Sequence, residues 1–139
     1  MTVPKMPLAP RDAMVELMIM TSAVDSDMGE LELRHIRSMV EQLPAFAGYS
    51  TDRLIEAAKT CAAELRKSQP ETVLARVVDA IPAHLCETAY AFVCDIAAAD
   101  RRLPPEELRF VQIVRTRLGI DRLVAAAIER ASAARYKTP

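Results

Sequence analysis

The chain has 139 residues, a formal net charge of −1, three cysteines and only three glycines. Its length suits one domain with its own hydrophobic core, and its odd number of cysteines does not suggest a disulfide framework. The nearly neutral charge argues against the basic surface that nonspecific nucleic-acid binding needs, so nucleic acid is set aside as a partner. Because Ala, Leu, Met, Glu and Arg dominate, the composition favours an all-α fold.

Residues 1–9 contain prolines and no long apolar run. This segment is therefore expected to be an extended N-terminal arm, and neither a signal peptide nor a membrane-spanning segment. We expect a single cytoplasmic domain over residues 1–139. Cys61, Cys86 and Cys94 lie within predicted helices, and we expect them to be small buried residues in a reducing compartment.

Two amphipathic segments open the domain. A first helix is expected over residues 10–24, beginning with a proline that suits a first turn, and the acidic turn at residues 25–29 ends it. A second helix is expected over residues 30–43, with Leu33 and Ile36 as core positions. Pro44 just beyond explains why that helix stops.

Two further helices are predicted in the middle of the chain. Ser50 or Thr51 can cap a third helix, which carries Leu54 and Ile55 and fades at residues 66–69. A fourth helix follows Pro70 and ends before Pro82. The loop before the third helix holds Phe46 and Tyr49, which we expect to fold back onto the core.

Three helices complete the predicted bundle of about seven. The fifth, over residues 85–100, has a nearly continuous apolar face and is expected to be the most buried. The sixth spans residues 105–118 with Gly119 as its C-terminal cap, and Asp121 caps a seventh at residues 122–134. Helical spacing predicts ten core residues: Leu17, Met18, Ile36, Val40, Val77, Phe92, Val93, Ile96, Val111 and Val114.

The chain nearly repeats itself at an offset of 75 residues. Residues 21–43 align with residues 96–118 without a gap. The identical pairs are Ala23/Ala98, Asp25/Asp100, Glu32/Glu107, Leu33/Leu108, Arg34/Arg109 and Leu43/Leu118. This pattern predicts a duplicated helical hairpin, in which helices one and two form one copy and helices five and six the other.

The two stretches at residues 24–34 and 97–109 each combine an acidic turn with a helix start. They resemble the TerB-like family, named after a bacterial tellurite-resistance protein. The resemblance implies an all-helical, internally duplicated fold that binds a divalent cation at its acidic turns. Carried over by position, the cation ligands are Asp25, Asp27, Glu32, Asp100 and Glu107. Oxygen ligands of this kind favour Ca²⁺, Mg²⁺ or Mn²⁺.

The second turn departs from the family pattern, because Arg101 and Arg102 stand where the family usually has glycine next to the aspartate. Their guanidinium groups would compete with a cation for Asp100. Glu107 is expected in the first turn of its helix after Pro104, which has no N–H for it to bond. Its carboxylate is then available to the arginines or to a cation shared with Asp100.

The acidic turns also have a purely structural interpretation. Asp27 and Glu30 are spaced as a capping box, and the first turn lacks the later positions of an EF-hand. The resemblance implies a non-enzymatic bacterial stress-response module. The alternative is a metal-free domain that binds a partner helix through an apolar groove or a methionine surface. An enzyme is least favoured, because no serine or cysteine comes with a recognisable base; we expect a protein partner.

Overall fold

The computed structural model describes residues 7–23, 30–100 and 104–139, and within these ranges the chain is helical and contains no strand. The all-α prediction is thus confirmed. The helices are α1 (Pro10–Ala23), α2 (Glu30–Gln42), α3 (Thr51–Lys67), α4 (Pro70–Asp79), α5 (Cys86–Ala99), α6 (Pro105–Leu118) and α7 (Arg122–Arg135). Two short 3₁₀ turns, η1 (Pro44–Phe46) and η2 (Ala83–Leu85), precede α3 and α5.

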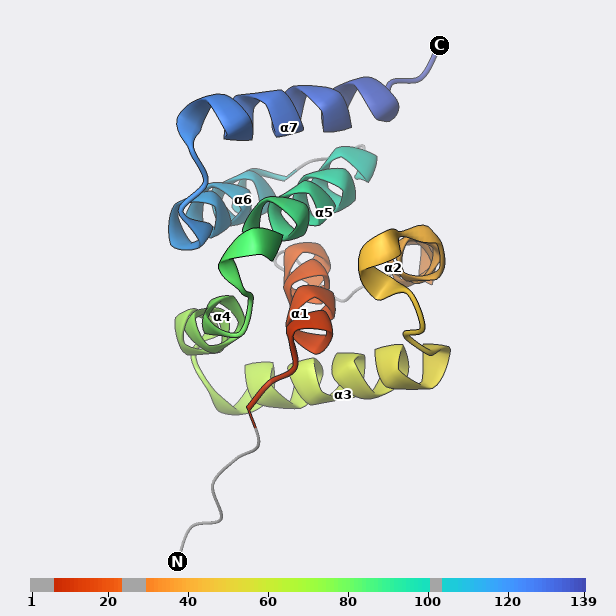
Figure 1. The fold of residues 1–139 in the computed structure, drawn as a ribbon, viewed down its shortest axis with the longest axis vertical. Coiled ribbons are helices and arrows are strands. Elements are labelled where there is room, and N and C mark those ends of the chain that lie inside the picture. The colour runs from red at the N-terminus through yellow and green to blue at the C-terminus, as the bar shows by residue number, and fades with distance from the viewer. Residues whose placement is uncertain (1–6, 24–29, 101–103) are drawn as a thin grey trace, which may run out of the picture.

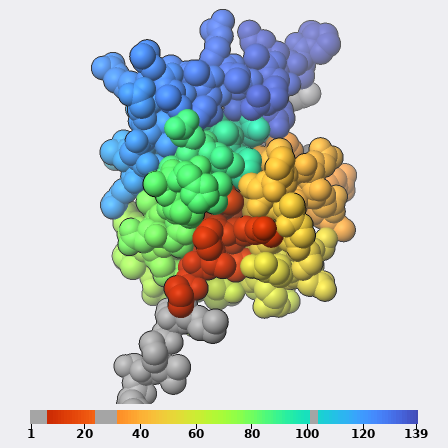
Figure 2. All heavy atoms as spheres, in the orientation of Figure 1, coloured from red at the N-terminus to blue at the C-terminus, as the bar shows by residue number. Residues whose placement is uncertain are grey.

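Helix α1 occupies the centre of the bundle. It packs against α3 and α5 above all, and also against α4 and α2, while α3 and α7 lie at opposite ends of the molecule (Figure 1). Every residue from Ala13 to Ser22 is buried. In the space-filling view only a narrow strip of red atoms is visible between the green and yellow segments (Figure 2). The expectation that α5 would be the most buried helix is therefore wrong, because α1 is enclosed on more sides.

The caps predicted from sequence are present where side chains or glycine can supply them. The Ser50 hydroxyl accepts a hydrogen bond from the Arg53 N–H at the start of α3. Asp121 accepts from two backbone N–H groups at the start of α7. Gly119 ends α6 in the left-handed region with φ of 68°, a conformation that glycine adopts without steric cost.

The loop between α2 and α3 folds back onto the core as expected. Phe46 is buried and lies 5.5 Å, between ring centroids, from Phe92 of α5. The Tyr49 hydroxyl donates a 2.6 Å hydrogen bond to Asp12 of α1. These contacts fix the end of α2 and the beginning of α3 against the two central helices.

The core prediction is largely confirmed. Nine of the ten residues predicted from helical spacing are buried, whereas Val111 is half-buried and packs against the core. Leu33 was expected in the core and is 41% exposed, because Ile36, Met39 and Val40 form the buried face of α2 instead. The side chain of Leu33 is therefore accessible at the surface of α2.

Burial on the two central helices follows the 75-residue offset. Helix α1 packs on α3 and α5 packs on α7, and the two central helices pack on each other. The pairs buried in both helices include Met14/Ala89, Val15/Tyr90, Leu17/Phe92, Met18/Val93 and Ile19/Cys94. The packing is compatible with an internal duplication, which itself stays a prediction.

Within the described ranges, no single helix has both the length and the apolar character needed to cross a membrane. Only α4 taken together with the η2 and α5 segment reaches these values, and that pair is bent by 108°.

Candidate functional site

The acidic residues implied by the family resemblance that the structure describes lie in α2, at the end of α5 and in α6. Asp25 and Asp27 fall outside the described residues, as do Arg101 and Arg102. Glu32 lies half-buried in the first turn of α2, and Asp100 is the half-buried C-terminal cap of α5. No three His, Cys, Asp or Glu side chains among the residues seen in the structure come together as a metal-binding group.

Glu107 is the acidic-turn residue whose environment is most unusual. It lies in the first turn of α6 after Pro104, as predicted, and its N–H bonds to the Pro104 carbonyl at 3.0 Å. The residue is only 2% exposed. A buried carboxylate needs compensating hydrogen bonds or charges, and Glu107 is not without a partner in the fold.

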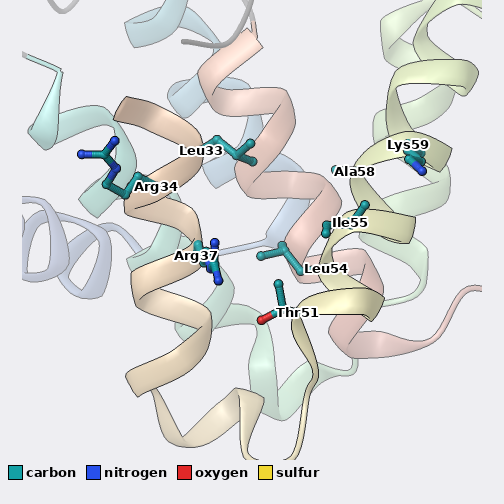
Figure 3. Close-up of a pocket in the computed structure, with 8 residues that line it drawn as sticks. All are labelled: Leu33, Arg34, Arg37, Thr51, Leu54, Ile55, Ala58 and Lys59. Carbon is teal, nitrogen blue, oxygen red and sulfur yellow. The ribbon is translucent and has the colours of Figure 1, made fainter. Parts of the chain in front are cut away.

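A groove of about 400 Å³ runs between α2 and α3. Its apolar lining comes from Leu33 of α2 and from Leu54, Ile55 and Ala58 of α3. Figure 3 shows Leu33 and Leu54 pointing from their helices toward the space between them. Because Leu33 is 41% and Ile55 is 46% exposed, the groove presents branched aliphatic side chains to solvent.

Positive charge surrounds this apolar lining. Arg34, Arg37 and Lys59 line the groove together with Thr51, and among the residues that the structure describes no carboxylate lines it. In Figure 3 the Arg34 side chain extends from the side of α2 away from Leu33 and α3, whereas Lys59 lies on α3. Arg37 bonds Glu41 one turn later at 3.2 Å, but both side chains are more than half exposed, so this pair is weak. Neither Arg34 nor Lys59 forms an ion pair with any described residue.

A second groove of about 410 Å³ lies among α5, α6 and α7. Its apolar residues include Leu108, which is 46% exposed, and Val111. Three of its polar residues, Tyr90, Arg115 and Glu129, are paired with one another. The Glu129 carboxylate accepts a 2.7 Å hydrogen bond from the Tyr90 hydroxyl and lies 3.6 Å from an Arg115 nitrogen. Among the described lining residues of this groove, the one carboxylate and the one guanidinium therefore balance each other.

The two grooves correspond at the 75-residue offset. Four positions line both of them: Leu33/Leu108, Arg37/Gln112, Leu54/Glu129 and Ala58/Ala133. The exposed leucine and the small alanine are common to both grooves, whereas the charges differ. The α2–α3 groove has the cation Arg37 where the α5–α6–α7 groove has the neutral amide of Gln112. It has Leu54 where the other groove has the carboxylate of Glu129. Of these two grooves, the α2–α3 groove is the one whose described lining combines apolar side chains with charge of a single sign.

The cysteines are not arranged for nucleophilic chemistry. Burial raises the pKa of the Cys61 thiol to about 12 and that of the Cys94 thiol to about 11. Burial also raises the pKa of Cys86, which is half-buried. Thiols with a raised pKa hold their proton near neutral pH and are poor nucleophiles.

Sequence reasoning missed two polar arrangements. The Nε2 atom of His35 on α2 lies 3.1 Å from the hydroxyl of Tyr136, beyond the end of α7. Glu16 is fully buried on α1 beside Arg76 of α4. Neither pairing could be read from the chain, because the partners are 101 and 60 residues apart.

Comparison of the chain with known protein families, with curated proteins and with solved structures returned no match. The resemblance to the TerB-like family consequently rests on the residues of the two acidic turns.

Proposed function

We propose that this protein is a non-enzymatic interaction module that holds a segment of a partner protein in the groove between α2 and α3. The observation that carries the proposal is the exposure of Leu33 and Ile55 on facing helices beside a space of about 400 Å³. A leucine at a helical core position that remains in solvent loses the free energy its burial would provide. A partner that covers it recovers that free energy.

The form of the groove suits a helical partner. Its α3 wall is a stripe at positions 51, 54, 55 and 58, which is the spacing of one helix face. A groove between two helices can accept the apolar face of a third helix through anchors at i, i+4 and i+7. The raised pKa values of the buried thiols favour a binding role over cysteine chemistry.

Selection from a displayed library of helical peptides tests the proposal. Apolar residues occupy i, i+4 and i+7 in every member, and the flanking positions vary among Glu, Gln, Ser and Lys. The proposal expects binders whose affinity is lost in Leu33→Ser and in Ile55→Ser. Because both side chains are more than 40% exposed, these variants should keep the melting temperature of the parent protein.

Leu108→Ser is the matched control, since it removes a similarly exposed leucine from the corresponding position of α6. Peptides whose binding is retained in Leu108→Ser and lost in Leu33→Ser would support binding in the α2–α3 groove. Recovery of no binder sensitive to Leu33 or Ile55 would contradict the proposed function.

Cation binding at the acidic turns is a second candidate function. It is favoured by Glu107, a carboxylate held at 2% exposure in the turn that the family resemblance marks for a cation. Calorimetric titration with Ca²⁺, Mg²⁺ and Mn²⁺ on metal-free folded protein tests it, and Asp25→Asn and Asp100→Asn should weaken any binding seen. A flat titration with all three ions would remove this candidate. The cytoplasmic stress-response role implied by the same resemblance also stays a proposal.

A further inference from the structure

We propose that the occupant of the α2–α3 groove is an acidic amphipathic helix of a partner protein, with carboxylates flanking its apolar anchors. This inference rests on the proposed function and adds the chemical class of the partner. It is drawn from the charges around the groove.

Charge complementarity is the first argument. The lining residues that the structure describes include three cations and no anion, although the whole chain carries a net charge of −1. Arginines also line a hollow on α6, whose one apolar lining residue among those described is Ile113, so it is positive charge beside several apolar side chains that distinguishes the α2–α3 groove. Carboxylates placed on either side of the apolar anchors would lie near Lys59 and near Arg37, whose exposed pair with Glu41 is weak. Such pairing adds specificity and speeds association more than it adds affinity.

The open form of the groove is the second argument. Leu33 and Ile55 keep between 41% and 46% of their surface exposed, so one side of any occupant would remain in water. A ligand that is apolar all round would leave part of its own surface exposed to solvent. An amphipathic helix instead buries one face and keeps its polar face hydrated.

The α5–α6–α7 groove provides an internal comparison. It has similar volume and a similarly exposed leucine, but Glu129 already engages both Tyr90 and Arg115 there. A carboxylate from a partner would meet a carboxylate of this protein. If apolar surface alone decided binding, a peptide would bind the two grooves equally well. The difference in charge is the reason to expect an acidic peptide to prefer the α2–α3 groove.

The test compares three synthetic versions of the strongest groove-binding peptide, with all flanking positions Glu, all Gln or all Lys. The Glu version should bind roughly tenfold more tightly than the Gln version, as expected for several exposed ion pairs acting together. The Lys version should bind least tightly. The differences should shrink as salt is added, because exposed charges are screened.

Charge reversal in the protein should invert this order. Arg37→Glu combined with Lys59→Glu should favour the Lys peptide, whereas Arg117→Glu, an exposed arginine of α6 outside the groove, should leave the order unchanged. Equal affinity of the Glu and Lys peptides, with binding still lost in Leu33→Ser, would overturn the acidic-partner inference and leave the proposed function standing. Failure of every peptide at the groove would overturn both.

Two other occupants of the α2–α3 groove would be identified by different experimental results. The first is a small anionic amphiphile, for which laurate is the probe. Laurate would have to displace the Glu peptide, lose its own binding in Leu33→Ser, and bind with an affinity that no peptide exceeds. A dimer of the protein alone that dissociates in Leu33→Ser would identify a second copy of the chain. Either result would overturn the inference, whereas a monomer that binds the Glu peptide more tightly than laurate would support it.

Discussion

Glu16 of α1 is completely buried and lies with its Oε1 3.2 Å from a guanidinium nitrogen of Arg76 on α4. Its other oxygen, Oε2, is buried without a hydrogen-bond partner. Burial raises the pKa of Glu16, and the nearby positive charge of Arg76 opposes part of that rise. The central helix thus carries a carboxyl group whose pKa is raised by burial and by the Glu64 and Asp12 carboxylates, and is held down in part by Arg76.

Replacing Arg76 with methionine should destabilise the protein at pH 7 by about 1–3 kcal/mol, because a buried carboxylate loses its charged donor. The loss is limited, since Glu16 can take up a proton instead. Urea unfolding measures it. Arg37→Met, which breaks an exposed pair, is the control and should change the free energy of unfolding by no more than about 0.5 kcal/mol. An equal loss in both variants would contradict a special role for Glu16 and Arg76.

The same pair predicts a pH dependence. Because its folded-state pKa is raised above 4.5, Glu16 holds its proton more tightly in the folded chain than in the unfolded chain. The stability it contributes is fully present below pH 4.5 and is lost as pH rises through the folded-state pKa. Glu16→Gln does not titrate, so its stability relative to the parent should increase from pH 4.5 toward pH 7. A difference independent of pH would contradict the raised pKa.

Truncation in the central helix should be far more damaging than truncation at the surface. Leu17→Ala removes a completely buried side chain and should cost about 2–5 kcal/mol of unfolding free energy. Leu123→Ala changes a leucine of α7 that is 81% exposed, and should stay within about 0.5 kcal/mol of the parent. Similar losses for the two variants would be incompatible with α1 as the centre of the core.

The three thiols should differ in reactivity toward a disulfide reagent at pH 8. Cys86 is half-buried and should react first in the folded protein. Cys61 and Cys94 are buried with a raised pKa, and should react only when the chain unfolds. Cys86→Ser should remove the early phase; an early phase that persists in this variant would place another thiol at the surface.

Local rules predicted the helices and most of their ends from sequence. Prolines, Ser50, Asp121 and Gly119 act within one turn of where they stand, so their effects do not depend on the tertiary structure. Burial around α1 could not be predicted in the same way. Glu16 looks like a solvent-facing residue in the sequence, and its burial depends on α4, which supplies Arg76 from 60 residues away.

The candidate site was predictable only in part. An apolar groove for a partner helix was an alternative in the sequence analysis, but Leu33 was assigned to the core because it fits the helical spacing. Whether Leu33 is covered by a neighbouring helix depends on the angle at which α2 and α3 cross. No local sequence pattern encodes that crossing angle. The cation-site prediction stays open, since Asp25 and Asp27 lie outside the described residues.

The most direct test of the groove is nuclear magnetic resonance of the ¹⁵N-labelled protein during titration with the strongest groove-binding peptide in its all-Glu form. We predict that the largest amide shift changes fall on α2 and α3 around Leu33, Leu54 and Ile55, and that they vanish in Leu33→Ser. Changes should remain small around Leu108 in the α5–α6–α7 groove. Shift changes centred on that second groove, or unaffected by Leu33→Ser, would contradict a partner site between α2 and α3.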